Sequence, residues 1–332
     1  MPKILYHWRV SAGSTAGGIE DSKPYATLAG IRAVENHLSR LGLSATVDQA
    51  RRPATYRVRY RVPEDEPLVS IVIPNKDSLS VLRQCVDSIL DKSTYDAYEI
   101  VIVENNSTEV ETFAYYEEVA KDARVRCVFF DGPFNFSKII NQGVEAAKGE
   151  YCILLNNDTE VITPDWIETM LGLCARQDVG AVGVKLYYPD DTIQHAGIGF
   201  GFLTLAAHMH KNFPVGHPGY MGRLVYAQDV YAVTAACLMV RRSVYEQVNG
   251  LDESFAVAFN DVDFCVRVRE AGYTNVFTPF AQLYHYESKS RGLDENPVKR
   301  KRFISEVERF QKRWAKQLAA GDPCMNPNFD LM

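Results

Sequence analysis

The sequence predicts an α/β protein with a doubly wound, mostly parallel sheet, helices on both faces of that sheet, and a small N-terminal accessory module. From residue 68 onward, short β-branched runs alternate with amphipathic helical stretches. Polar clusters follow three of these runs, at the ends where doubly wound sheets bind their ligands. Hydrophobic residues make up 46% of the 332 residues, which is enough apolar material for a sizeable core.

The first 66 residues are expected to form the accessory module and a linker. Residues 25–41 carry apolar side chains at helical spacing, and Gly42 follows as a helix stop. Residues 55–62 alternate apolar and basic side chains, which predicts an amphipathic strand. A polar linker bracketed by prolines, residues 63–67, ends this region.

A main domain is expected over residues 67–295, and its first half, residues 67–160, has the most regular pattern. Its apolar runs are short enough for buried parallel strands, and the stretches between them are amphipathic. The order β-α-β-α-β-α-β predicts a parallel sheet. The expected strands are residues 68–73, 98–103, 125–130 and 151–155, and the expected helices are residues 79–90, 110–120 and 136–147.

The second half, residues 161–295, is more mixed, and a C-terminal helix and tail are expected over residues 296–332. Residues 197–209 are apolar and rich in glycine, which predicts a hairpin or a loop. The other expected strands are residues 179–186 and 232–240, and the expected helices are residues 164–174, 245–250, 261–271 and 303–318.

Charge and cysteine content argue against several classes of function. The formal net charge is -6, which argues against a nucleic-acid partner or a generally basic membrane-binding surface. Seven cysteines without a C-x-x-C pair argue against a disulfide framework or a structural zinc site. The sequence shows no transmembrane run and no secretory signal, so we expect a cytoplasmic protein.

The ends of the predicted strands bring polar side chains to one edge of the sheet. Residues 75–77 follow the first strand, residues 104–106 the second and residues 156–158 the fourth. Ligands of such sheets bind beyond the carboxyl ends of the strands, so these clusters locate the expected site. Asp158, with the two amides before it, suits a hard divalent cation that also binds phosphate oxygens. The alternative is an Asx turn at the end of a strand, which is common.

Two features of the second half carry titratable side chains. Asp261 stands at a predicted loop-to-helix junction, where the alternative to a catalytic carboxylate is a helix N-cap with a first-turn acid. His285 lies in an aromatic run, where the alternative to a metal ligand is a hydrogen-bonded structural histidine. The residues alone leave both alternatives open.

Taken together and in this order, these features resemble the inverting family 2 glycosyltransferases of the GT-A fold. The whole chain is similar to members that assemble bacterial surface polysaccharides, rhamnans and O-antigens. The matching segments are the opening strand (residues 70–74), the end of the second strand (103–108), the helix and strand before the D-x-D motif (141–151), that motif (156–158), the acceptor-side segment (250–255) and the E-D motif (260–263).

Two positions depart from the family's pattern. Asn156 occupies the first D-x-D position and supplies no charge, which leaves Asp158 as the main expected metal carboxylate. Asn260 replaces the glutamate of the E-D motif, whereas Asp261, the expected base, is kept.

The resemblance implies transfer of a sugar from a nucleotide-diphosphate donor. A Mg²⁺ or Mn²⁺ ion held by Asp158 and His285 is expected to bridge the two phosphates. Asp261 is expected to take the proton of the acceptor hydroxyl as that oxygen attacks, and this single displacement inverts the anomeric configuration. The donor nucleotide is expected to contact Pro74, Asn75, Asp77, Glu104, Asn105, Lys138 and Asn157, and the sugar or the acceptor is expected to contact Asn156, Trp166, Asn260 and Asp263. For Trp166, the alternative is an ordinary core aromatic.

The resemblance also implies the partners. The expected donor is a UDP-, dTDP- or GDP-linked sugar, and the expected acceptor is a saccharide or a lipid-linked saccharide. Arg291 and the basic run at residues 299–302 are candidates for peripheral contact with the inner membrane or with other glycosyltransferase modules, and the alternative is a solvated helix start. His208 and His210 are interpreted as part of an acceptor-side loop, with a metal role as the alternative.

Other functions are compatible with a parallel sheet. A sugar-1-phosphate nucleotidyltransferase is expected to carry a glycine-rich phosphate loop after its first strand, and residues 74–78 contain no glycine. A dinucleotide oxidoreductase needs G-x-G-x-x-G at the same place, which is also absent from the sequence. A non-catalytic sugar-nucleotide or carbohydrate-binding module remains as an alternative, because Asn156 and Asn260 stand where acids are expected.

Overall fold

The computed structural model describes residues 6, 24–51, 55–202, 205–287 and 297–326 of the chain. Arg291, one of the candidate basic residues, lies outside the described residues. In the part that is described, no helix is both long and apolar enough to cross a lipid bilayer.

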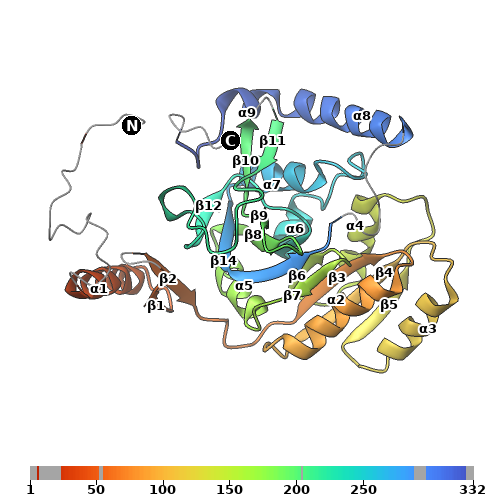
Figure 1. The fold of residues 1–332 in the computed structure, drawn as a ribbon, viewed down its shortest axis with the longest axis horizontal. Coiled ribbons are helices and arrows are strands. Elements are labelled where there is room, and N and C mark those ends of the chain that lie inside the picture. Colours follow the sequence, from red (N-terminus) through yellow and green to blue (C-terminus); the bar gives the residue numbers. More distant parts are fainter. Residues whose placement is uncertain (1–5, 7–23, 52–54, 203–204, 288–296, 327–332) are drawn as a thin grey trace.

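The described residues form a ten-stranded sheet with the order β12-β14-β8-β13-β6-β3-β4-β5, to which the short strands β7 and β9 add by pairing with β14 and β8 (Figure 1). The strands of the first half all run parallel, with the first of them paired on both sides. The predicted doubly wound sheet is confirmed, and each element of this half lies within two residues of its expected bounds. The strands are β3 (Val69–Asn75), β4 (Tyr98–Glu104), β5 (Val125–Phe129) and β6 (Tyr151–Leu155), and the helices are α2 (Leu79–Lys92), α3 (Val110–Val119) and α4 (Phe136–Ala146).

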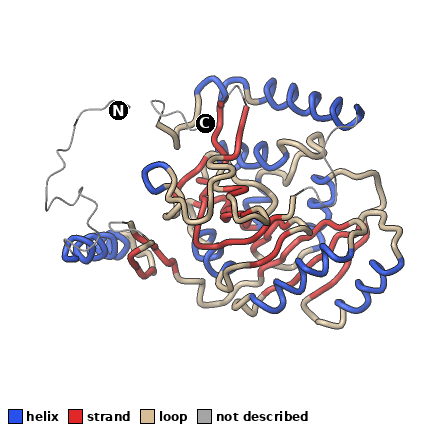
Figure 2. Tube along the Cα trace, viewed as in Figure 1, coloured by secondary structure: helices blue, strands red, loops and turns tan. Residues whose placement is uncertain are grey.

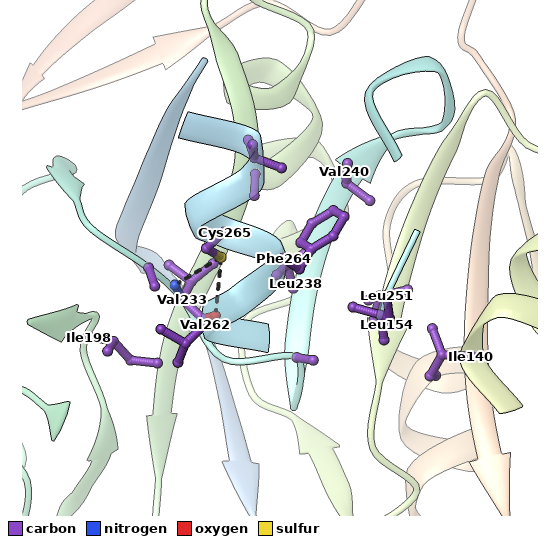
Figure 3. Packing of buried hydrophobic residues seen from close by; sticks show 14 of the residues in the cluster. Ile140, Leu154, Ile198, Val233, Leu238, Val240, Leu251, Val262, Phe264 and Cys265 are labelled. Carbon is purple, nitrogen blue, oxygen red and sulfur yellow. Dashed lines mark hydrogen bonds between the residues drawn. The ribbon is translucent and has the colours of Figure 1, made fainter. Parts of the chain in front are cut away.

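The sheet separates two hydrophobic cores, because successive side chains of a strand point to opposite faces. Along β3, Val72 belongs to one core, whereas Ile71 and Ile73 belong to the other. Helices α4 and α7 cover the first face, and α2, α3 and α5 cover the second. Figure 2 shows helices on both sides of the strands, and Figure 3 shows part of the first core.

The second half mixes parallel and antiparallel pairing. Strand β14 runs parallel to β8, whereas β13 is antiparallel to both β6 and β8. The glycine-rich segment folds as a hairpin, which is one of its two expected forms. The remaining strands are β7 (Thr159–Val161), β8 (Val179–Tyr187), β9 (Ile193–His195), β10 (Ile198–Phe202), β11 (Leu205–His208), β12 (Gln228–Val230), β13 (Cys237–Arg241) and β14 (Thr274–His285). The helices are α5 (Trp166–Cys174), the 3-10 turn η1 (Tyr220–Gly222), α6 (Arg242–Gln247) and α7 (Asn260–Glu270).

Two parts of the second half differ from the expectation. The strand expected over residues 232–240 begins only at Cys237, and residues 232–236 cross between strands as irregular backbone. Strand β14 was not predicted, because Pro279 interrupts its pattern and its pairing with β8 shifts register between Thr278 and Gln282.

The two ends of the chain pack differently on the main sheet. At the N-terminal side, α1 (Pro24–Arg40), β1 (Ala45–Gln49) and β2 (Tyr56–Tyr60) lie beside the main body (Figure 1). Arg57 of β2 donates to Asp165, just before α5, at 3.1 Å. At the C-terminal side, the expected single helix is divided into α8 (Pro297–Arg313) and α9 (Ala315–Ala320). Phe310 of α8 is fully buried in the first core.

Helix α4 approaches the sheet closely at Gly143. A Cβ at this position would overlap Cγ1 of Val72 and lie 2.7 Å from Cγ2 of Val103. The absence of a side chain at Gly143 therefore sets the distance between α4 and the strands that end at the cavity described below.

Gly143→Ala should lower the free energy of unfolding by about 1–3 kcal/mol, the usual cost of overpacking a core. At an open helix site the same change would raise stability by about 1 kcal/mol, so the sign of the effect reports the close contact. Urea unfolding followed by circular dichroism measures it, with Glu145→Ala on the exposed face of α4 as the control. A Gly143→Ala variant as stable as the control would contradict this packing.

Candidate active site

A cavity of about 390 Å³ lies where the parallel strands end. Its volume falls within the range of about 300–1,000 Å³ usual for small-molecule sites. Seven of the sequence-predicted site residues line it: Pro74, Asn75, Asp77, Asn105, Asn156, Asn157 and Asp158. Lys76, a member of the expected polar cluster at residues 75–77, also lines the cavity, together with four residues outside the expected clusters: Ser78, Phe134, Phe136 and Ile139.

An amide bridge ties the ends of the neighbouring strands β3 and β6 together in one wall of the cavity. The Nδ2 of Asn157 donates to the Oδ1 of Asn75 at 2.6 Å, and the Nδ2 of Asn75 donates to the hydroxyl of Tyr116 at 2.8 Å. These bonds fix the orientation of both amides, which makes this wall of the cavity rigid.

The Asp77 carboxylate is held by the turn that follows β4. Its Oδ1 accepts from the backbone N–H groups of Thr108 at 2.6 Å and Glu109 at 3.0 Å. Burial opposes ionisation of this carboxyl, but these two backbone donors outweigh it and lower the pKa of Asp77 below its usual value. Asp77 is therefore an anionic part of the cavity wall.

Glu104 does not line the cavity and has a different part in the structure. It is 2% exposed, and its carboxylate accepts from the hydroxyls of Ser107 and Tyr116. These bonds hold its carboxylate inside the turn, and contact between Glu104 and the nucleotide stays a prediction. Glu104 therefore affects the site by fixing the conformation of the turn at residues 104–107.

Asp158 and His285 meet at the floor of the site. The pairing of β14 with β7 sets His285 opposite Thr159, just after the β6 turn. The Nε2 of His285 then lies 3.2 Å from the Oδ1 of Asp158 and 3.2 Å from the Nδ2 of Asn156. Both Asp158 and His285 are buried, and a backbone bond from Tyr286 to the carbonyl of Asp158 holds the two segments together.

This pair fits a divalent cation. A carboxylate oxygen and an imidazole nitrogen converge on one point, and Mn²⁺ accepts both ligand types, whereas Mg²⁺ favours oxygen. Across the described ranges, three or more His, Cys, Asp or Glu side chains do not gather at any such point. A cation held here would therefore complete its coordination with donor phosphates and water.

Asp261 lies in the first turn of α7, and three contacts fix its place. Its Oδ2 accepts from the backbone N–H of Ala235 at 3.2 Å, and its Oδ1 accepts from the N–H of Val262 at 2.8 Å. Its own N–H donates to the Oδ1 of Asn260 at 2.7 Å. Asn260 is buried and its amide also donates to Val257, so it shapes the start of α7 and is not available to an acceptor, contrary to expectation.

The loop before Asp261 is anchored from α8. The buried Glu306 carboxylate accepts from three successive backbone N–H groups, those of Ala256, Val257 and Ala258, at 2.8–3.2 Å. Helix α7 is also tied to the crossing segment, because the thiol of Cys265 and the backbone of Val233 lie 3.5–3.6 Å apart (Figure 3).

The segment at residues 235–236 connects the Asp158 side of the site to Asp261. The carbonyl of Ala236 accepts from the N–H of Asn156 at 3.0 Å, while the N–H of Ala235 donates to Asp261. Two adjacent residues therefore bind the end of β6 and the start of α7 through their backbone. The structure thus brings Asp158 and Asp261, 103 residues apart in sequence, to neighbouring parts of one site.

A pair of histidines lies beside this site in the β9–β11 region. The backbone N–H of Gly197 donates to the Nε2 of His195, which assigns the proton of the neutral His195 ring to Nδ1. That Nδ1 lies 3.0 Å from the Nδ1 of His208, which must then accept and carry its own proton on Nε2. Burial lowers the pKa of both rings, while Asp261 opposes the effect at His208. The neutral His208 ring therefore carries its proton on Nε2, and it lies close enough to Asp261 for that carboxylate to affect its pKa, an arrangement that the sequence did not indicate.

Three other expected site residues lie away from the cavity. Trp166 is fully buried in the second core, with its Nε1 donating to Ser93, so it is a core aromatic and not a sugar platform. Asp263 is fully buried and accepts from Arg267 of α7, Arg313 of α8 and Trp314, which follows α8. Lys138 is not among the residues that line the cavity, and its ammonium lies 3.8 Å from Glu253.

The chain matches the family model described as Glycosyl transferase family 2 over residues 70–248. It is 46% identical over 332 residues to uncharacterized protein y4gI of Sinorhizobium fredii, and 39% identical over 297 residues to O-antigen biosynthesis protein RfbC of Myxococcus xanthus. These alignments cover 99% and 88% of this chain but only 36% and 23% of the relatives, so the chain spans about a third or less of their length. An N-acetylglucosaminyl-diphospho-decaprenol L-rhamnosyltransferase of Mycobacterium tuberculosis is 28% identical over 154 residues, 44% of this chain and 50% of that protein.

Two solved structures share the fold. A crystal structure of GalNAc-T7 with UDP, GalNAc and Mn²⁺ superposes with a TM-score of 0.60 over 76% of this chain and 51% of its own. The mannosyltransferase PcManGT of Pyrobaculum calidifontis, in complex with GDP-Man and Mn²⁺, superposes with a TM-score of 0.55 over 87% and 73%. Each is 15% identical in sequence, so the likeness concerns the fold alone.

The stability of the protein should fall as the pH drops below about 6.5, where histidines of an unfolded chain begin to gain protons. Burial holds the pKa of His195 well below that value, so protons then bind preferentially to the unfolded chain and lower the free energy of unfolding. One such group contributes a slope of up to about 1.4 kcal/mol per pH unit.

His195→Gln should flatten this part of the profile, whereas His37→Gln, at an exposed position of α1, should not. Urea midpoints between pH 5 and pH 7.5 provide the measurement. If the stability of the native protein and of His195→Gln changes with pH in the same way, the His195 ring gains its proton as easily in the folded protein as in the unfolded chain, which would contradict this account.

Proposed function

The chain belongs to glycosyl transferase family 2, and on that premise we propose that it transfers a sugar, with inversion, from a nucleotide-diphosphate donor to a saccharide acceptor with the help of a divalent cation. One observation carries the proposal: Asp158 lines the cavity at the strand ends and contacts His285, and residues 235–236 join the end of β6 to Asp261. The groups that would hold a leaving diphosphate are thus connected through two backbone hydrogen bonds to a carboxylate that can accept a proton.

The nucleotide would lie along the ends of β3 and β4. Asn75 and Asn105 supply fixed amides there, and Asp77 supplies an anionic acceptor for the N–H or O–H groups of a base or a ribose. Phe134 and Phe136 add apolar surface for a ring. The structural neighbours contain UDP or GDP-Man, which supports a nucleotide-linked donor without choosing among UDP-, dTDP- and GDP-sugars.

Asp158 and His285 would hold a Mn²⁺ or Mg²⁺ ion, and both structural neighbours contain Mn²⁺. When bound, such an ion neutralises charge that develops on the diphosphate as it leaves. The Nδ2 of Asn156 lies 3.2 Å from the same Nε2 of His285, and a cation bound to that nitrogen would take the place of this contact.

Asp261 would act as the general base. Backbone donors at Ala235 and Val262 keep its carboxylate in one orientation, and each oxygen retains a lone pair for an acceptor hydroxyl. The oxygen of that hydroxyl would attack the anomeric carbon on the face opposite the diphosphate, and the product would have the inverted configuration. The Nε2–H of His208 would donate to an oxygen of the sugar or the acceptor.

The biological setting of the proposal is the synthesis of bacterial cell-surface polysaccharide. It is supported by two relatives, whose names refer to O-antigen biosynthesis and to rhamnosyl transfer onto a diphospho-decaprenol-linked sugar. The acceptor would accordingly be a saccharide or a lipid-linked saccharide. Since the chain covers only part of its longer relatives, we propose that it corresponds to one module of such proteins.

The donor class can be tested by thermal shift with UDP-, dTDP- and GDP-sugars, each with Mn²⁺ and with EDTA. A ligand that binds the folded state raises the melting temperature by mass action. One of these three classes of nucleotide sugar should raise the melting temperature in the presence of Mn²⁺ and should no longer raise it in the presence of EDTA. If no nucleotide shifts the transition under either condition, the donor assignment is wrong.

Asp158→Asn should weaken Mn²⁺-dependent donor binding by more than about tenfold, since even outer partners of metal ligands contribute about 10–100-fold. The substitution keeps the shape of the side chain and removes its charge. Calorimetric titration of the nucleotide with Mn²⁺ measures the effect, with Asp178→Asn as a control on the exposed surface. Equal affinities of the two variants for the nucleotide with Mn²⁺ would show that Asp158 does not bind the cation.

Asp261→Asn should lower the rate of transfer by about 10²–10⁴-fold, the usual contribution of general-base catalysis. Donor affinity should stay close to that of the native protein, because Asp261 does not line the donor cavity. Steady-state transfer assays combined with donor titration separate the two effects. A native rate of transfer in Asp261→Asn would refute the base assignment, and failure of the native protein itself to transfer would favour a binding module.

A further inference from the structure

A second, smaller cavity of about 130 Å³ lies apart from the donor cavity and is lined by basic side chains. Its volume is well below the range of about 300–1,000 Å³ for drug-sized ligands, so it suits a small ion or one group of a larger molecule. It lies between the loop after β1, strand β8, the segment before β12, and β14. The lining residues that matter for the argument are Arg51, Lys185, Gly216, His217 and Gln282.

Lys185 is the unusual member of this set. Its side chain is 6% exposed, and its ammonium donates to one acceptor, the carbonyl of Leu224, at 2.6 Å. An ammonium has three N–H donors, so two of them remain for other partners. Burying a cation is costly unless an anion or several acceptors accompany it. The burial of Lys185 therefore needs a partner that the described residues do not provide.

Two further donors face the same cavity. The guanidinium of Arg51 lies against Gly216, where a Cβ would stand 3.1 Å from both terminal nitrogens. Gly216 has a φ of +81°, so glycine suits both the backbone conformation and the close approach of Arg51. The Nδ1 of His217 accepts from the N–H of Gly219 at 3.0 Å, which leaves its Nε2 as a donor.

The charges around this cavity are not compensated within the described residues. Burial and the nearby Arg51 lower the pKa of Lys185 to about 8, and no carboxylate contributes to that shift. His210 lies close by, with both ring nitrogens buried and without a hydrogen-bond partner among the described residues. Burial, followed by Arg223, His217 and Lys185, lowers the pKa of His210 to about 4. An acidic protein, with a net charge of -6, thus has a locally positive hollow.

We propose that Arg51, Lys185 and His217 form a binding site for a phosphate group, separate from the donor cavity. An oxyanion with several acceptor oxygens would take the free N–H groups of all three side chains and supply the missing negative charge. The guanidinium and ammonium donors would form charge-assisted bonds with it, which are stronger than those between neutral groups.

The site lies close to the reaction centre along one strand. Lys185 is paired with Gln282 of β14, and His285 is three residues further along that strand. At about 3.3 Å per residue, the backbones of Gln282 and His285 are roughly 10 Å apart, and this odd spacing turns their side chains to opposite faces of the sheet. A phosphorylated acceptor bound here would therefore extend past the end of β14 to reach the reaction centre. The assignment to the acceptor rests on the proposed function, whereas the binding of phosphate itself does not.

The site can be tested by calorimetric titration in EDTA without any nucleotide, so that cation-dependent binding in the donor cavity does not contribute. The probes are inorganic phosphate, a hexose 1-phosphate and the matching free hexose. The variants are Lys185→Met, which keeps an apolar stem of similar length, and Arg51→Gln. The control is Lys121→Met, which removes an exposed lysine after α3.

The native protein and Lys121→Met should bind the phosphate-containing probes equally, with no heat from the free hexose. Lys185→Met should weaken this binding by at least about tenfold and Arg51→Gln by severalfold, in line with the loss of charge-assisted bonds. Tighter binding of the hexose 1-phosphate would assign the site to a phosphorylated acceptor, and equal affinities would assign it to free phosphate.

Melting curves without ligand separate binding from folding. Removal of a buried, uncompensated charge should leave Lys185→Met at least as stable as the native protein. The proposal is overturned if phosphate fails to bind the native protein, or if Lys185→Met binds it as tightly. Neither outcome affects the Mn²⁺-dependent binding of nucleotide, so the donor site is judged separately.

Discussion

The backbone at residues 235–236 is the feature on which the candidate active site depends. The carbonyl of Ala236 accepts from Asn156 at the end of β6, and the N–H of Ala235 donates to Asp261 at the start of α7. These two bonds join the cavity that would hold a diphosphate to the carboxylate that would take a proton. Ala235 and Ala236 have small side chains, which allows the segment to pass between the end of β6 and the start of α7. The distance between the Asp158 and Asp261 carboxylates follows from this path.

Much of the fold is predictable from the sequence because its signals are local. In the first half, buried parallel strands and amphipathic helices leave patterns within five to fifteen residues, and all seven elements occur within two residues of their expected bounds. Strand β14 is different, since Pro279 and a register shift interrupt its pattern and its pairing with β8 decides its conformation. Residues 232–236 are apolar enough for a strand, but hydrogen bonds from Asn156 and to Asp261 hold them as a crossing segment.

The site was predictable to the extent that it follows the strand ends. Pro74, Asn75, Asp77, Asn105 and residues 156–158 share one cavity because parallel strands end at one edge. Asp263 and Trp166 look like ligand-binding residues in sequence, yet the packing of α5, α7 and α8 buries both. The His195–His208 pair and Lys185 were not found because their significance depends on partners distant in sequence or on the lack of a counter-charge. Such features can be recognised only in the three-dimensional structure.

The central claim is that Asp158 and His285 hold the cation beside the cavity that holds the diphosphate. Paramagnetic broadening of backbone amide signals tests this directly, because Mn²⁺ broadens nearby nuclei first. In a titration with Mn²⁺ and a nucleoside diphosphate, the account predicts that the amides of residues 156–159 and 284–286 broaden before the others. Broadening that begins around Arg51 and Lys185, or at scattered surface carboxylates, while residues 156–159 keep their signals, would contradict it.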